Sequence, residues 1–151
     1  MKQEEYLTAI KKQQSLIRKL LANRKRRSEV IDELTRERYD HLRGKFFKVP
    51  KDDKHFRGAF DVQTFFIYGI EGGEDYDGST VGVMLRCRRI SCMYENGQVT
   101  NIGIHNQSFH FSHTDNLDDI LAPLYISQEK AAEETSAMYN EFIKNFLKKG
   151  W

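Results

Sequence analysis

Residues 80–113 read TVGVMLRCRRISCMYENGQVTNIGIHNQSFHFSH, and this stretch decides the fold. Its centre is the dipeptide Asn96-Gly97, which lies between two runs rich in β-branched and aromatic residues. Asn-Gly in this setting favours a two-residue type I′ turn, because both central residues of that turn must tolerate a positive φ. We therefore expect two long antiparallel strands joined by a tight hairpin.

Other strands extend this hairpin into a sheet. Residues 45–49 form a short candidate strand that ends at Pro50, and residues 60–70 show the alternation of a strand. Within residues 80–94 the apolar positions change face, which predicts a bulge or bend near Arg88-Arg89. Residues 45–114 are therefore expected to form a small antiparallel β-sheet or, if the bulge curls it, a partly closed SH3-like barrel.

The last segment, residues 115–151, reads as a turn followed by a helix that packs on this body. Pro123 interrupts the first helical turn, and Ser127 opens a helix that ends at Gly150. Together with the sheet, this helix places the chain in the α+β class. The residues on its broad apolar face are Thr135, Met138, Tyr139, Phe142, Ile143, Phe146 and Leu147.

Residues 1–44 read as a basic helical arm that precedes an acidic body. When the chain is divided after Lys48, the first part holds 14 Lys and Arg against 7 Asp and Glu, a net charge of +7. The remaining part holds 10 against 15, a net charge of −5. Such an asymmetry points to an arm that meets an acidic partner.

Two geometries of the arm agree with its pattern. Leu7, Ile10, Ile17 and Leu21 form an apolar seam at helical spacing, which fails across residues 22–27 and resumes from Val30 onwards. The arm is therefore either a helical hairpin or one kinked coiled-coil helix. We favour the hairpin, because a continuous coiled coil would place polar residues in its seam.

The basic run Arg24-Lys25-Arg26-Arg27 and its neighbours could neutralise the phosphates of a nucleic acid. No zinc-finger, RRM or KH signature accompanies them. Three more arginines alternate with aromatic residues on adjacent strands, where exposed rings could stack on bases, although we expect Phe109 and Phe111 to fill the core. The candidate residues for binding nucleic acid or another partner are Lys11, Lys12, Arg18, Lys19, Arg24, Lys25, Arg26, Arg27, Arg36, Arg38, Arg86, Arg88 and Arg89.

Catalytic chemistry has less support in the sequence. His105, His110, His113 and Asp115 are metal-binding residue types, but in an extended strand His110 faces away from His113. The acidic connection at residues 71–79 lacks the closing glutamate of a calcium loop, and the two cysteines are too few for a disulfide framework. We therefore assign no catalytic residue, no metal ligand and no cofactor.

Hydropathy bears on the location of the protein. The sequence has no apolar run near 18 residues and no charged-then-apolar leader, so we expect a cytoplasmic protein without a membrane partner.

Three functions remain. The first is a non-enzymatic binding protein whose arm engages nucleic acid or a nucleoprotein machine. The second is a protein-only adaptor or inhibitor, which docks on an acidic protein surface or forms a homo-oligomer through its N-terminal helices. In outline it resembles small accessory proteins of bacteria and their viruses. The third is a small metal-dependent hydrolase or nuclease that uses residues 105–115.

Overall fold

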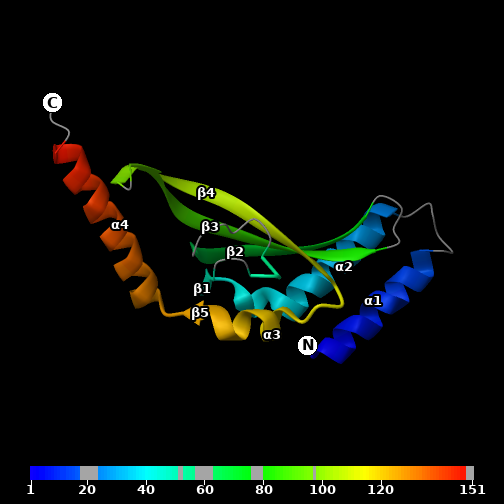
Figure 1. Ribbon diagram of the computed structural model, residues 1–151. Coiled ribbons are helices and arrows are strands. Elements are labelled where there is room, and N and C mark those ends of the chain that lie inside the picture. The colour runs from blue at the N-terminus through cyan, green and yellow to red at the C-terminus, as the bar shows by residue number, and fades with distance from the viewer. Residues whose placement is uncertain (18–23, 51–52, 57–62, 76–79, 97, 149–151) are drawn as a thin grey trace.

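An antiparallel sheet of five strands forms the centre of the structure, with helices packed on it from both ends of the chain (Figure 1). The computed structural model describes residues 1–17, 24–50, 53–56, 63–75, 80–96 and 98–148, some of them by backbone alone. The strands are β1 (Phe46–Val49), β2 (Gln63–Glu74), β3 (Val81–Glu95), β4 (Gln98–Ser112) and β5 (Tyr125–Ile126). The helices are α1 (Gln3–Ile17), α2 (Arg24–Tyr39), α3 (Leu117–Leu121) and α4 (Gln128–Lys148), and 3-10 turns η2 (Asp40–Leu42) and η3 (Ala122–Leu124) follow α2 and α3.

The strand order is β4-β3-β2-β1-β5, and every pair of neighbours in this order is antiparallel. The α+β class with an antiparallel sheet is therefore confirmed. The described strands form an open sheet whose edges are β4 and β5, so the predicted SH3-like barrel is not what these residues show.

The predicted hairpin is confirmed by the register of β3 and β4. Glu95 pairs with Gln98, and Asn96 between them has a φ of 52°, the left-handed conformation that the turn requires.

Of the bulge or bend predicted near Arg88-Arg89, a bulge in β3 is wrong, because both residues pair with β4 in unbroken register. An extra residue lies instead in β2, where the pairing steps across Tyr68, and a second irregularity lies nearer the hairpin turn. The apolar positions change face without a bulge, because the part of the hairpin nearest its turn packs against α4, which lies on the other face of the sheet. Ile102 of β4, for example, lines a hollow together with residues of α4.

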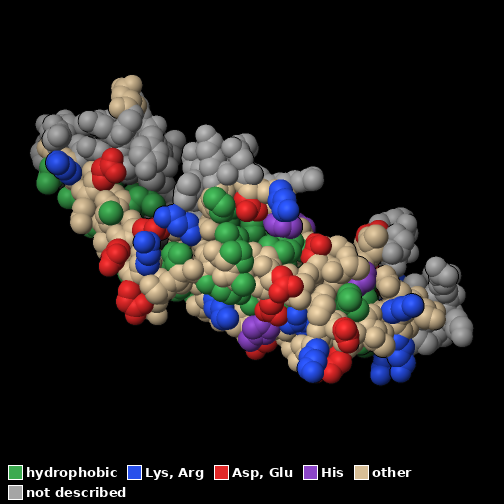
Figure 2. Space-filling model, turned by 60° about the horizontal axis from the view of Figure 1, so that its bottom comes forward, with side chains coloured by type: hydrophobic (Ala, Val, Ile, Leu, Met, Phe, Trp, Pro, Cys, Tyr) green, Lys and Arg blue, Asp and Glu red, His purple; other side chains and the backbone are tan. Residues whose placement is uncertain are grey.

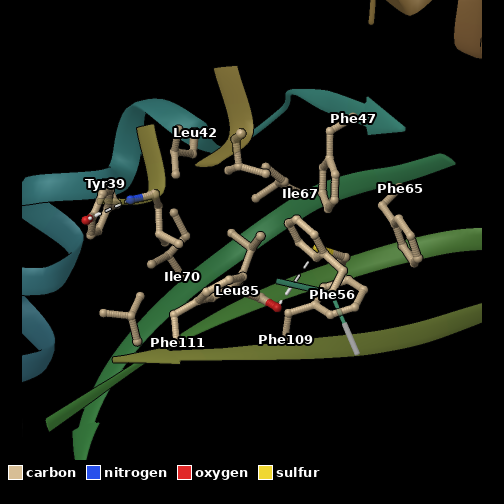
Figure 3. Packing of buried hydrophobic residues seen from close by; sticks show 14 of the residues in the cluster. Tyr39, Leu42, Phe47, Phe56, Phe65, Ile67, Ile70, Leu85, Phe109 and Phe111 are labelled. Carbon is tan, nitrogen blue, oxygen red and sulfur yellow. Dashed lines mark hydrogen bonds between the residues drawn. The ribbon is translucent and has the colours of Figure 1, made fainter. Parts of the chain in front are cut away.

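Aromatic side chains fill the core beneath one face of the sheet (Figure 3). The Phe65 ring lies 5.3 Å from that of Phe47 and 5.0 Å from that of Phe109. Phe56 also packs edge-on to Phe109, at 4.9 Å, although its segment reads as a polar loop in the sequence. Phe109 and Phe111 are buried, as expected, so neither ring is free to stack on a base.

Helices α1 and α2 run antiparallel, so the arm folds back on itself (Figure 1). At the start of α1, the Gln3 side chain accepts a hydrogen bond from Arg38 at the end of α2, over 3.0 Å. One turn further on, the Tyr6 hydroxyl lies 3.1 Å from Thr35 Oγ1. Of the two arm geometries, the structure therefore has the folded-back one. The buried apolar residues of the arm join the core of the sheet.

Helix α2 approaches the backbone of β2 at Gly72. A Cβ at Gly72 would lie 2.1 Å from Thr35 Oγ1 and 2.9 Å from the carbonyl oxygen of Ile31. In the same place the Gly72 amide donates a hydrogen bond to Asp32 Oδ1 over 3.0 Å. This contact therefore requires glycine because of space.

We predict that Gly72→Ala destabilises the protein by about 1–3 kcal/mol, the cost typical of overpacking a close contact. The neighbouring Gly73→Ala is the matched control, because a Cβ at Gly73 meets nothing within 4 Å. Urea unfolding followed by circular dichroism measures both variants. Equal free energies of unfolding for the two variants would contradict the close packing of α2 on β2.

Helix α4 lies over the opposite face of the sheet. Glu134 accepts hydrogen bonds from Lys48 Nζ at 2.6 Å and Thr64 Oγ1 at 2.7 Å. These two residues alternate with the buried Phe47 and Phe65, so they project from the other side. The predicted Ser127 start is confirmed, because its hydroxyl caps the helix by accepting from the Lys130 amide.

Candidate functional site

The most basic part of the chain spans the end of α1 and the start of α2. Residues 11–28, which we call the basic segment, contain eight Lys and Arg and no Asp or Glu. Among the described side chains of this segment, Lys11, Lys12 and Arg26 are exposed. The first turn of α2 contains no acidic residue, so its positive side chains adjoin the positive end of the helix dipole.

The remaining residues of the basic segment are placed only in part. Arg24 and Lys25 belong to α2, but their side chains lie outside the described residues. Arg18 and Lys19 lie outside the described residues altogether.

Arg27 belongs to the same run but points into the protein. Its Nε donates to both carboxylate oxygens of Glu74 at 3.0 and 3.1 Å, and Ser28 Oγ donates to the same carboxylate. The Arg27 and Glu74 side chains are 9% and 2% exposed. Arg27 therefore joins α2 to the end of β2, and its charge is neutralised inside the chain.

Arg38 is also buried and paired. Its Nη1 donates to Asp118 Oδ2 over 2.6 Å, while its Nε and Nη2 donate to Gln3 and Asn116. The guanidinium also lies 4.5 Å from the centre of the Tyr39 ring. Arg38 therefore connects the end of α2 to the starts of α1 and α3.

Four further candidate arginines lie apart from the basic segment. Arg36 is exposed on α2 and forms an ion pair of 3.0 Å with Asp32, one turn away. On the sheet, Arg86 pairs with Glu71 at 2.9 Å, Arg88 stacks 4.4 Å from the centre of the Tyr68 ring, and Arg89 donates to Gln107.

Where the structure describes the predicted apolar seam of the arm, the seam packs inside the protein itself. Ile10 is fully buried in the core, and Leu7 is partly buried. Ile17 ends α1 and is described by its backbone alone, and Leu21 lies outside the described residues. At Ile10, therefore, the seam faces the protein's own core.

The histidines on β4 and just after it do not converge with one another. His105 and His110 are exposed at different positions of the strand, while His113 Nδ1 lies 3.0 Å from the carbonyl oxygen of Val81. Asp115 accepts a hydrogen bond from the Ser112 amide. Across the described part of the chain, no group of three or more His, Cys, Asp or Glu side chains is arranged to hold a metal ion.

Acidic residues at the end of β2 and just after it serve the fold. Glu71 and Glu74 pair with the arginines described above, and Asp75 accepts hydrogen bonds from Thr80.

Cys87 is buried, and desolvation raises the pKa of its thiol well above the ordinary value. As for membranes, no described helix has the length and apolar character needed to span one.

The chain matches no protein-family model, no curated protein and no solved structure.

Composition could not separate the two buried arginines from the exposed ones. Arg27 continues a run of four cations, and its acceptor Glu74 lies 47 residues away. One local signal was present in the helical spacing, because Arg27, Ile31 and Thr35 recur every four residues and Ile31 is apolar. In the structure Ile31 and Thr35 are buried, and Arg27 lies on the same face of α2.

We predict that Arg27→Ala lowers the free energy of unfolding by about 3–5 kcal/mol, because it leaves the Glu74 carboxylate buried and unpaired. Arg26→Ala is the matched control and should change stability by no more than about 0.5 kcal/mol, since Arg26 is exposed. Thermal and urea unfolding would measure the difference. If Arg27→Ala proved as mild as the control, the inward position of Arg27 would be refuted.

Asp118 makes the contacts around Arg38 dependent on pH. Burial acts to raise the pKa of its carboxyl, but hydrogen bonds from His41 and Arg38 outweigh it and hold the pKa below its ordinary value. A carboxyl with a lowered pKa stabilises the fold above the pKa of the unfolded chain, about 4. This stabilisation disappears as the pH falls through the pKa of the folded state.

Asp118→Asn should therefore cost about 1 kcal/mol at pH 7, a value that allows for solvent screening of this partly exposed group. The difference from the wild type should shrink in acid as Asp118 becomes protonated. Asp119→Asn is the control, because Asp119 occupies the same first turn of α3 but is exposed. Unfolding curves at several pH values test this, and a cost independent of pH would exclude the charged contacts as its source.

Proposed function

We propose that the protein is a non-enzymatic nucleic-acid-binding protein that contacts phosphates through the basic segment. The observation that carries the proposal is the absence of any acidic residue from this segment, together with the exposure of Lys11, Lys12 and Arg26. The charges of such a segment are available to an external anion unless they are paired inside the chain. Arg27 is paired in this way and is left out of the contact surface.

The start of α2 supports an anionic partner. Lys and Arg at a helix N-terminus are repelled by the helix dipole, so this turn is less stable than one that begins with acidic residues. A phosphate group beside it would offset that repulsion, and the backbone amides of a first helical turn can donate hydrogen bonds to phosphate oxygens. The arrangement is therefore better suited to a bound anion than to open solvent.

The chemistry of the segment also sets the kind of binding. Lysine and arginine contacts to phosphates release counterions and are insensitive to base sequence. We therefore propose binding that depends steeply on salt and little on sequence. The sheet arginines add less, because Arg86 and Arg89 have partners within the chain.

The test is a charge reversal that spares the fold. Arg24→Glu, Lys25→Glu and Arg26→Glu are combined while Arg27 is retained, since Arg27 holds Glu74. The control combines Lys2→Glu, Arg43→Glu and Lys54→Glu, which reverses three exposed charges outside the segment and gives the same net charge. Circular dichroism verifies that both variants are folded.

Binding to labelled single- and double-stranded DNA and RNA is then measured across a salt series. We expect the segment variant to bind at least tenfold more weakly than the control. On duplex DNA, the slope of log affinity against log salt should become shallower by about 0.9 for each phosphate that the variant no longer neutralises. Equal weakening in both variants would reject the segment as the binding surface. Absence of binding at low salt would favour the alternative function, an adaptor or inhibitor that docks on an acidic protein.

A further inference from the structure

Exposed apolar side chains gather at α4 and the part of β4 beside it. Among the described residues, four large hydrophobic side chains are exposed, and three of them lie here. Ile104 is 75% exposed, Tyr139 56% and Leu147 59%. Apolar side chains that gather on one exposed surface are a mark of an interaction site.

These residues belong to one side of the sheet. Ile102 and Ile104 lie on the same face of β4, opposite to the buried Phe109 and Phe111, because side chains alternate along the unbroken register. Ile102 lines a hollow together with Thr135, Ser136, Tyr139 and Asn140 of α4. We call Ile102, Ile104, Tyr139, Leu147 and this hollow the α4 surface.

Helix α4 is fixed to the sheet near its beginning. Ala131 is buried, and Glu134 is held by Lys48 and Thr64. Beyond these residues the helix runs along the outside of the molecule towards the tip of the β3–β4 hairpin (Figure 1). In the surface view, hydrophobic side chains are visible between charged ones along this part of the molecule (Figure 2).

The charges along α4 indicate which molecule binds the α4 surface. Its first two thirds, residues 128–141, contain four Glu and one Lys, whereas residues 142–148 contain two Lys and no acidic residue. This gradient complements itself when a second α4 is placed antiparallel to the first. With the two helices fully overlapped, exposed Glu133 lies within about one residue of Lys144 of the partner subunit, which is exposed as well.

The hollow agrees with the same arrangement. Residues 135–140 lie at the middle of α4, where the two-fold axis of a full antiparallel overlap would cross it. A residue beside such an axis contacts its own copy, so Tyr139 would pack near the partner's Tyr139 across the hollow. Tyrosine is among the residues enriched at the centres of protein interfaces.

We propose that the α4 surface binds a second copy of this chain, forming a two-fold dimer through antiparallel α4 helices. This inference is independent of the proposed function, because it rests on α4 and β4 and is tested without nucleic acid. The dimer would also carry two basic segments on one particle, which strengthens binding to a long polyanion through effective concentration.

The experiment is sedimentation of the full chain over a range of concentrations. We expect the wild type to have the mass of a dimer. Tyr139→Lys combined with Leu147→Lys should have the mass of a monomer with an unchanged circular dichroism spectrum. Ala122→Lys is the control that should remain a dimer, because Ala122 is exposed and belongs to η3, outside both α4 and β4.

Charge exchange tests the antiparallel orientation. Lys144→Glu should weaken the dimer by about tenfold. Adding Glu133→Lys should restore the dimer, because the two charges of each contact between position 133 and position 144 have then exchanged places and attract again. A wild type that is monomeric at every concentration would overturn the proposal. So would a dimer that survives Tyr139→Lys with Leu147→Lys, or a weakening by Lys144→Glu that Glu133→Lys does not restore.

Discussion

The close approach of α2 to β2 at Gly72 is the contact on which the other packing depends. With no side chain at Gly72, Thr35 and the backbone of α2 come directly against the strand, and the Gly72 amide bonds to Asp32. The Arg27–Glu74 ion pair lies further along the same helix and strand. Together these contacts set the direction of α2, and thereby the place where the basic segment meets solvent.

Positive charge in this protein therefore occurs in two settings. Arg27 and Arg38 are buried and bind carboxylates, so their value lies in joining elements distant in sequence. Removing Arg27 is costly because the Glu74 carboxylate remains buried, whereas Asp118 is partly exposed and solvent screens its charge. Lys11, Lys12 and Arg26 stay exposed at the surface. The net charge of +7 over the first 48 residues thus overstates what the arm can offer to a polyanion.

The two faces of the sheet differ in how completely they are covered. One face is closed by α2, α3 and a cluster of phenylalanine rings, which form a continuous core (Figure 3). The other face carries α4, which is anchored near its start by Ala131 and Glu134 and leaves Tyr139 and Leu147 exposed beyond them. The proposed polyanion contact and the proposed dimer contact therefore belong to different parts of the chain and can be altered separately.

Local patterns in the sequence were enough for the hairpin at Asn96-Gly97, the start of α4 at Ser127 and the α+β class, because turn and cap chemistry act over a few residues. Local patterns could not show whether the sheet closes into a barrel, since strand alternation is the same in an open sheet and a barrel. The basic segment is equally a property of the sequence. Which arginines it offers to a partner was decided by tertiary structure, because Glu74 and Asp118 reach Arg27 and Arg38 only after distant segments have packed together.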